Sequence, residues 1–244
     1  MATARRERYR KQTREEAKVV ALAQLAEAGT AGISVNAIAK AMGMTGPALY
    51  RYFANRDELL TELITDAYRE LAEAASRAVA DAAPADRFRA LARALRDWAK
   101  QHPDRYLLIY GTPVPGYQAP PETTEIAARL MRTILDACAT VGAAAAPGSG
   151  TTGSGADGAG GEGAGGGCGQ SLTPLEAELA RHLEGAGPWV PGEEPGGELK
   201  GRALRTWTRL HGVISLDLQG HFTDMGFDPS VLFEAEIDAL VRGG

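Results

Sequence analysis

The sequence predicts an all-α protein in which a small N-terminal helical domain precedes a larger helical domain. Apolar residues recur every three to four positions through most of the 244-residue chain, which is the spacing of one face of a helix. Near the N-terminus, two short helical stretches flank a glycine, and glycine commonly ends a helix. With 44% hydrophobic residues, the chain can bury the cores of one or two soluble domains.

Composition indicates in which cellular compartment the protein is located. No run approaches the roughly 20 apolar residues that a membrane-spanning helix needs, and the basic N-terminus lacks the apolar segment of a signal peptide. The two cysteines, Cys138 and Cys168, lie in very different contexts, so free thiols are the simplest account. We therefore expect a cytoplasmic protein without a membrane partner.

Charge is distributed unevenly along the chain. The net charge is −5, but residues 1–60 hold ten Lys and Arg against six Asp and Glu, a net of +4. The remainder holds 16 basic and 25 acidic residues, a net of −9. A basic end can face nucleic-acid phosphates while the acidic remainder stays away, although a solvated charge run would give the same count.

The N-terminal domain is expected to begin after a basic flexible arm. Residues 1–12 carry five basic side chains and are expected to be disordered when free. Such an arm could follow phosphates, enter a minor groove or only aid solubility, and the sequence leaves these alternatives open. Thr13 and Glu16 have the spacing of a capping box, so the first helix is predicted to start there and to end at Gly29.

A pair of short helices follows this first helix. Ser34 is placed to cap the earlier one, and Gly43 lies where that helix must stop. Thr45 marks the start of the second, which is predicted to run to Phe53. Two short helices joined by a glycine-containing turn are typical of the helix-turn-helix DNA reader, so residues 13–56 are predicted to form a three-helix DNA-binding domain.

The second short helix is the candidate recognition helix. Its N-terminus has small residues that let it approach base edges and phosphates closely. Tyrosine hydroxyls and guanidinium groups further along can donate to phosphate oxygens. The predicted DNA contacts are Ser34, Thr45, Gly46, Pro47, Ala48, Tyr50, Arg51, Tyr52 and Arg56.

The stretch from Ile38 to Leu60 also resembles the signature of the TetR family of one-component transcriptional regulators. IAKAMGMTGPALYRYFANRDELL has the family's order: Ile-Ala, glycine, an apolar residue, Ser or Thr, an aromatic motif, a basic and an acidic residue, and two leucines. Two departures are mild, since Arg56 replaces the usual lysine and Tyr52 stands where histidine is frequent. The resemblance covers about a tenth of the chain and implies a DNA-binding regulator.

A long helix is predicted to join the two domains. Apolar residues keep helical spacing from Asn55 towards Pro84, so this helix begins in the DNA-binding domain and ends in the next one. A shift at its far end would move its near end. Residues 57–244 then form the effector-binding and dimerisation domain, with further helices at about 85–101, 106–110, from Pro121, at 172–183, at 198–223 and after Asp228.

A glycine-rich insertion interrupts this second domain. Residues 142–170 contain 13 glycines and no large apolar residue, so they cannot bury enough surface to offset the entropy lost on ordering. We therefore predict a disordered segment there. Cys168 within it should be exposed and oxidisable, which leaves open a redox-sensing role or an incidental thiol.

The last two helices are expected to form a dimer interface. Their apolar surface exceeds one face, which indicates burial against two surfaces and a four-helix bundle across a twofold axis. The TetR resemblance implies the same, and Trp207, His211 and Gly212 resemble a C-terminal subgroup named for Trp-His-Gly. The expected interface residues are Leu210, Ile214, Leu218, Phe233, Ile237 and Leu240.

Aromatic and polar residues of the second domain are candidates for a small-molecule pocket. An apolar cavity with a few polar groups is the usual form of such a site. Simple core packing would explain the same residues. The candidate pocket residues are Trp98, Tyr106, Ile109, Tyr110, Met131, Trp207 and His211.

The sequence contains no recognisable catalytic or metal-binding motif. The four histidines are not paired at helical spacing, and there is no Cys-x-x-Cys, Gly-x-Ser-x-Gly or phosphate-binding loop. We expect no enzyme activity, metal or cofactor.

The sequence thus predicts a homodimeric regulator that binds double-stranded operator DNA, most simply a repressor released by an unknown small molecule. A non-specific architectural DNA binder and a helical interaction protein without DNA binding are the alternatives. The operator, the ligand and the regulated genes cannot be predicted from the residues.

Overall fold

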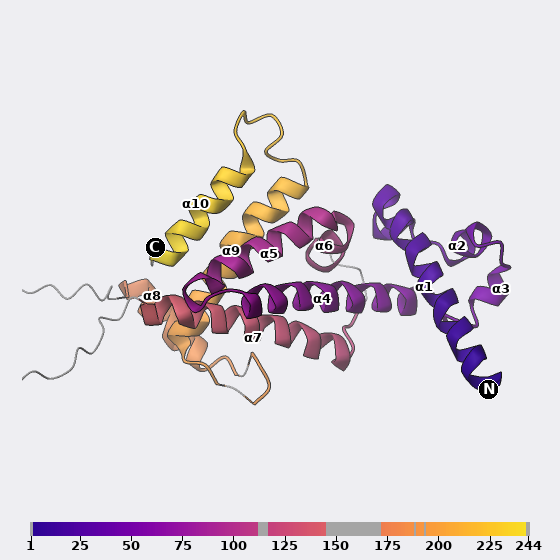
Figure 1. The fold of residues 1–244 in the computed structure, drawn as a ribbon, viewed down its shortest axis with the longest axis horizontal. Coiled ribbons are helices and arrows are strands. Elements are labelled where there is room, and N and C mark those ends of the chain that lie inside the picture. Colours follow the sequence, from indigo (N-terminus) through magenta and orange to yellow (C-terminus); the bar gives the residue numbers. More distant parts are fainter. Residues whose placement is uncertain (1, 112–116, 145–171, 188, 193, 243–244) are drawn as a thin grey trace, which may run out of the picture.

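The chain folds into helices arranged in two domains (Figure 1). The structure is a computed structural model and describes residues 2–111, 117–144, 172–187, 189–192 and 194–242. Over these residues there is no β-strand, which confirms the predicted all-α class. The same residues contain no helix that is both long and apolar enough to cross a membrane.

The N-terminal domain contains α1 (Ala2–Ala28), the short 3-10 helix η1 (Thr30–Gly32), α2 (Val35–Ala41) and α3 (Gly46–Leu49). Its apolar core also takes in the first turns of α4 (Arg56–Asp81). The recognition helix is shorter than predicted because the backbone tightens after α3. There the N–H of Tyr52 donates to the Leu49 carbonyl, three residues back, at 2.8 Å.

Gly43 ends α2 as the sequence predicts. Its φ of 67° lies in the left-handed region, which glycine adopts without steric cost. The N–H of Met44 then donates to the Ala39 carbonyl at 2.8 Å, which closes the end of the helix. The chain therefore turns sharply between α2 and α3.

The structure has a helix where the sequence predicts a flexible arm before Thr13, because α1 already begins at Ala2. This stretch lacks glycine and proline and is rich in Arg, Lys, Glu, Gln and Ala, which are good helix formers. Thr13 does not cap a helix, since its hydroxyl donates to the Tyr9 carbonyl at 3.0 Å within α1. Packing against the domain begins at Thr13, which is buried, whereas residues 3–12 are exposed.

The second domain is built around α4, which crosses from one domain into the other as predicted (Figure 1). α4 packs against α5 (Arg87–Gln101) and α7 (Pro121–Ala144), and η2 (Pro84–Asp86) turns the chain between α4 and α5. The short helix α6 (Pro103–Tyr110) contacts α4, α5 and α1, so it lies where the two domains meet.

Three C-terminal helices complete the second domain: α8 (Pro174–Glu184), α9 (Gly197–Leu218) and α10 (Pro229–Arg242). α8 begins with a capping box between Thr173 and Glu176. α8 and α9 approach very closely, because a Cβ atom on Gly197 would overlap the carbonyl oxygen of Ala180. α10 packs on α9 and α5.

The predicted disordered insertion lies almost entirely outside the described residues. Its first positions, 142–144, belong to the end of α7, and the description resumes at residue 172. Cys168 is likewise outside the described residues. The other thiol, Cys138, is fully buried, as its place in an apolar stripe indicates.

Candidate nucleic-acid interface and effector site

The recognition segment, residues 45–53, presents an exposed surface on a buried anchor. Leu49 and Phe53 lie in the domain core and have no exposed area. The nine predicted DNA contacts all keep some contact with solvent. Among them, Ser34, Thr45, Pro47, Tyr50 and Arg51 are exposed, and Gly46, Ala48, Tyr52 and Arg56 are half-buried.

Ser34 caps α2 and retains a donor for another partner. Its hydroxyl oxygen accepts from the Ala37 N–H at 3.3 Å, and its own N–H donates to Gln24 Oε1 at 3.0 Å. Because the oxygen acts as an acceptor in the cap, the hydroxyl hydrogen remains available to a phosphate oxygen. The structure thus fits both predicted roles of Ser34.

Gly46 lets α3 approach α2 closely. A Cβ atom at this position would lie 2.5 Å from Asn36 Oδ1. A larger residue would displace the Asn36 side chain, so Gly46 has a packing role in addition to its predicted place near DNA. Asn36 is an exposed neighbour of the recognition segment that the sequence analysis did not identify.

The side chain of Arg14 on α1 holds the end of this segment in place. Its guanidinium lies 4.5 Å from the centre of the Phe53 ring, donates to the Tyr52 carbonyl and pairs with Glu58 at 3.1 Å and with Glu62. The N–H of Ala54 also donates to Glu58, at 2.6 Å. Sequence reasoning missed Arg14 because its partners lie 38 to 48 positions away.

Arg56 is directed into its own domain. Its Nε donates to the Ile33 carbonyl at 3.1 Å, and its terminal nitrogen donates to the Thr30 carbonyl. Arg56 therefore secures the loop that carries Ser34 into α2. This geometry does not favour the phosphate contact that the sequence analysis assigned to Arg56.

Polar contacts connect α1, α4 and α7 across the domain boundary. Lys18 on α1 pairs with Asp66 on α4 at 2.6 Å, and Arg69 on α4 pairs with both Asp66 and Glu122 on α7. A buried hydrogen bond of 2.7 Å also joins the hydroxyls of Thr65 and Thr123. The two domains are therefore linked through the same turns of α4.

Four of the seven candidate pocket residues form one aromatic cluster, which we define as Tyr106, Tyr110, Trp207 and His211. The imidazole of His211 stacks on the Trp207 indole with ring centres 5.2 Å apart. Tyr110 packs on Trp207 at 4.8 Å and on Tyr106 at 5.1 Å. Tyr68 of α4 reaches the cluster from the side, with its ring 5.8 Å from that of Tyr110.

The aromatic cluster contains one polar pair, since the Tyr106 hydroxyl lies 2.8 Å from His211 Nδ1. Burial lowers the pKa of His211 and raises the pKa of the Tyr106 and Tyr110 hydroxyls. Both partners are therefore neutral near pH 7, and the Tyr106 hydroxyl can donate to the imidazole. The cluster is thus an apolar site with a single uncharged hydrogen-bonding pair.

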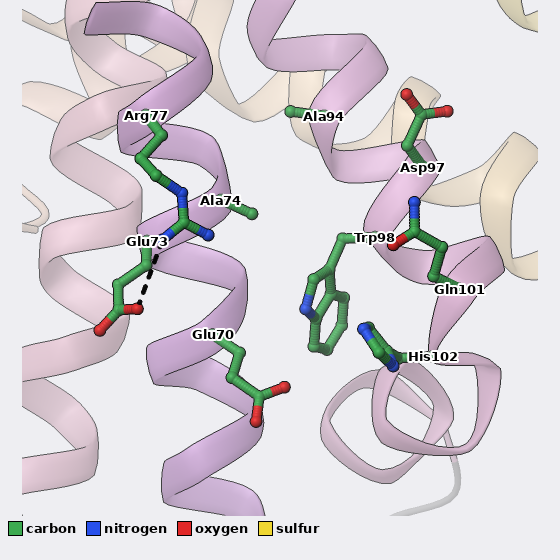
Figure 2. A pocket seen from close by; sticks show the side chains of 9 residues that line it. All are labelled: Glu70, Glu73, Ala74, Arg77, Ala94, Asp97, Trp98, Gln101 and His102. Carbon is green, nitrogen blue, oxygen red and sulfur yellow. Dashed lines mark ion pairs between the residues drawn. The ribbon is translucent and has the colours of Figure 1, made fainter.

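The remaining candidate pocket residues lie elsewhere. Ile109 and Met131 are half-buried and pack on the edge of the core. Trp98 lines a different opening, a cleft of about 390 Å³ between α4 and α5 (Figure 2). There its indole lies 5.4 Å from the His102 ring and faces Glu70 on α4, which pairs with Arg105 of α6. The other lining residues are Glu73, Ala74, Arg77, Ala94, Asp97 and Gln101.

The structure places most of the expected dimer-interface residues in the core of the single protomer. Leu210, Ile214, Phe233, Ile237 and Leu240 are each no more than 7% exposed in the single protomer, and Leu218 packs on the same core cluster. Their apolar stripe faces α5 and α7 of the same chain. The first five side chains are already buried and have almost no surface left to offer a partner, whereas Leu218 is half-buried.

A different face of α9 and α10 remains open. Leu216 is 42% exposed and Val231 is 67% exposed. A Cβ atom on Gly212 would meet no neighbouring atom within 4 Å, so a partner helix could approach α9 there. Thr208 and Ala235 are also exposed on these helices.

Known protein families match both domains of this structure. Residues 19–63 match the family described as bacterial regulatory proteins, tetR family, and residues 88–240 match the tetracyclin repressor-like, C-terminal domain. The HTH-type transcriptional regulators Rv1816 of Mycobacterium tuberculosis and Mb1846 of Mycobacterium bovis are each 36% identical over 233 residues. The match covers 93% of this chain and 90% of each relative.

Solved structures share the fold. The crystal structure of SCO4313 is 46% identical and superimposes with a TM-score of 0.73, covering 97% of this chain and 98% of that one. The TetR family transcriptional regulator PfmR from Thermus thermophilus covers 94% of this chain and 96% of its own, with a TM-score of 0.51. At 18% identity, the likeness to PfmR shows the fold alone.

The fold and the exposed recognition segment therefore define a helix-turn-helix transcriptional regulator, as the sequence predicts. The chain belongs to the TetR family, and its C-terminal domain is of the tetracyclin repressor-like type. Both the DNA-binding class and the two-domain helical fold are thus confirmed.

Proposed function

We propose that this regulator is a homodimeric repressor that a small-molecule ligand releases from its operator. The observation that supports the proposal most directly is the position of α4. In its first turns, Glu58 and Glu62 pair with Arg14, which donates to the Tyr52 carbonyl at the end of the recognition segment. Further along, α4 touches the aromatic cluster through Tyr68. A ligand that favours one arrangement of α4 would therefore change the distance between the two recognition segments of a dimer.

On DNA, each protomer would insert α3 into a major groove. Thr45, Gly46 and Ala48 would approach the base edges, because they are small and lie at the start of α3. The exposed hydroxyls of Ser34 and Tyr50 would donate to phosphate oxygens. Pro47, Arg51 and Tyr52 complete the proposed surface.

The aromatic cluster is the proposed effector site. It combines flat apolar rings with one neutral hydrogen-bonding pair, Tyr106 and His211, which suits a small, mainly apolar ligand. Such a ligand would have to displace part of the ring packing around Tyr110. Because Tyr68 contacts Tyr110, that displacement would act directly on α4.

The dimer would form through the open face of α9 and α10 that includes Leu216 and Val231. This assignment replaces the buried residues of the sequence prediction and keeps the same pair of helices. Burial of exposed apolar side chains would supply the driving force.

Gel-shift titration of the purified protein against its own upstream intergenic DNA tests the proposal. We expect one retarded complex that contains two protomers and resists random-sequence competitor DNA at near-physiological salt. The complex should dissociate when the correct effector is added. Equal competition by random DNA would instead favour a non-specific architectural protein, and loss of all binding even at low salt would contradict DNA recognition.

A further inference from the structure

The first turns of α1 stand apart from the rest of the domain. From Thr3 to Gln12 every residue is exposed, although all of them are helical. Besides the bond from Thr13 to Tyr9, Gln12 donates to Glu16 within the same helix. The charge of Arg10 also helps to lower the pKa of Glu58 on α4.

The extension is strongly basic. Residues 2–12 carry five basic side chains and one acidic one, a net charge of +4, in a protein whose total net charge is −5. A helix whose side chains are all exposed gains little stability from burial, so a binding partner would stabilise it. Five cationic side chains on one short helix match a surface of closely spaced negative charges, which duplex DNA provides.

The position of the extension also points to DNA. Arg14, the residue at which α1 meets the recognition segment, donates to the carbonyl of Tyr52. The extension leaves the domain from this point and continues for roughly 16 Å, at about 1.5 Å per residue. In Figure 1 the N-terminal end of α1 lies at the same end of the molecule as α3.

We propose that residues 2–12 form a basic helix that lies along the phosphate backbone beside the bases read by α3. This inference rests on the proposed DNA-binding function and assigns it a second, sequence-independent contact surface. The helix is continuous with the packed part of α1, so its first turns need no separate nucleation. It therefore presents its charges in an ordered array, unlike a flexible arm.

The test compares salt dependence between variants of the full-length protein. Affinities for the upstream DNA and for a random duplex are measured over a series of KCl concentrations. The triple variant R5Q/R6Q/R8Q keeps good helix formers and removes three charges. We expect weaker binding to both duplexes and a shallower slope of log K against log salt, by about 0.9 for each phosphate that the variant no longer neutralises. The ratio of specific to random affinity should stay unchanged.

Two further variants test whether the effect depends on where the charges lie and on whether the extension is helical. K100Q/R129Q/R181Q removes three charges from exposed sites in the second domain and should keep the wild-type slope. Y9P keeps every charge but breaks the helix at an exposed position, so it should lose affinity in the same way as the arginine variant.

Each outcome bears on the proposal. If R5Q/R6Q/R8Q behaves like K100Q/R129Q/R181Q, the extension does not contact DNA. If Y9P binds like the wild type, the contact does not require a helix and the proposal is overturned in favour of a flexible arm. If the wild type binds neither duplex, the proposed function fails first, and this inference fails with it.

Discussion

Individual side chains divide the recognition segment into an anchor and a reading surface. Arg14 ties α1 to the end of this segment through Tyr52, Phe53 and the carboxylates of α4, while Tyr50 stays 43% exposed. The anchor sets where the surface stands, and the surface is free to meet another molecule. Changes in the two groups should therefore have different consequences.

Tyr50→Phe should weaken DNA binding without affecting stability. The variant loses only the hydroxyl proposed to donate to a phosphate, at a cost of about 1 kcal/mol or roughly fivefold in affinity. The loss should be similar for operator and random DNA, since a phosphate contact carries no sequence information. Gel-shift titration measures the affinity, and thermal unfolding should give an unchanged Tm. Unchanged affinity would remove Tyr50 from the phosphate contacts.

Glu58 should make the stability of the N-terminal domain depend on acid pH. The Ala54 N–H, and then Arg14, hold the pKa of Glu58 below its usual 4.5. Since the pKa is lower in the folded state, the stabilisation is present above pH 4.5 and is lost as pH falls through the folded-state value. The contribution is no more than about 1 kcal/mol, because the side chain is partly exposed.

Urea unfolding of wild type and Glu58→Gln at several pH values checks this prediction. The wild type should be the more stable protein near neutral pH, and the difference should shrink as the pH falls below 4.5. A difference that stays constant over this range would mean that ionisation of Glu58 does not contribute.

At the scale of elements, the close packing of α8 against α9 depends on the absence of a side chain at Gly197. Gly197→Ala would place a Cβ atom against the backbone oxygen of Ala180, which cannot move like a flexible side chain. We expect a loss of about 1–3 kcal/mol in the free energy of unfolding. Gly201→Ala is the matched control on the same helix, because its Cβ would lie 3.7 Å from Leu183 in ordinary contact. Equal stability of the two variants in urea unfolding would contradict this packing.

The sequence was most informative where the signals are local. Ser34, Gly43 and Asn55 each act within a few residues of their own position, so the caps and the turn could be predicted. Arg14 and Lys18 could not, because their partners are 38 or more residues away. The helical extension of α1 was missed because a basic, Pro-free stretch suits both a helix and a solvated arm.

Most of the expected interface residues lie in the core of the protomer for a related reason. An apolar stripe such as Leu210 and Ile214 indicates that a helix face is buried, but it does not say against which surface. In the structure α5 and α7 of the same chain pack against α9, and side chains outside the stripe, such as Leu216, remain exposed. The effector residues could be predicted only in part. Four of the seven candidates lie in the aromatic cluster, whereas Trp98 lines a separate cleft.

At the scale of the whole molecule, charge and the path of α4 give the protein two unlike ends. Residues 1–60 are net positive and the remainder is net negative, so the domain that carries α3 can approach DNA while the other domain is repelled. α4 runs from one end into the other (Figure 1). A dimer joined at the acidic end would hold two basic ends towards the same duplex.

Leu216→Glu should prevent dimer formation. A charge at this 42% exposed position would have to be buried in the proposed interface, which is costly without a partner charge. Val19→Glu, at a 67% exposed position in the DNA-binding domain, is the control. Light scattering after size exclusion should give a monomer mass for Leu216→Glu and a dimer mass for wild type and Val19→Glu. A dimeric Leu216→Glu protein would place the interface elsewhere.

Hydroxyl-radical footprinting on the upstream intergenic DNA tests the central claim most directly, because it reports where each protomer meets the backbone. We expect two protected patches on one face of the duplex, separated by one helical turn of about 10 base pairs or a multiple of it. Added effector should remove both patches together. Protection that is uniform along the DNA, or absent at every protein concentration, would contradict a dimeric, sequence-specific regulator.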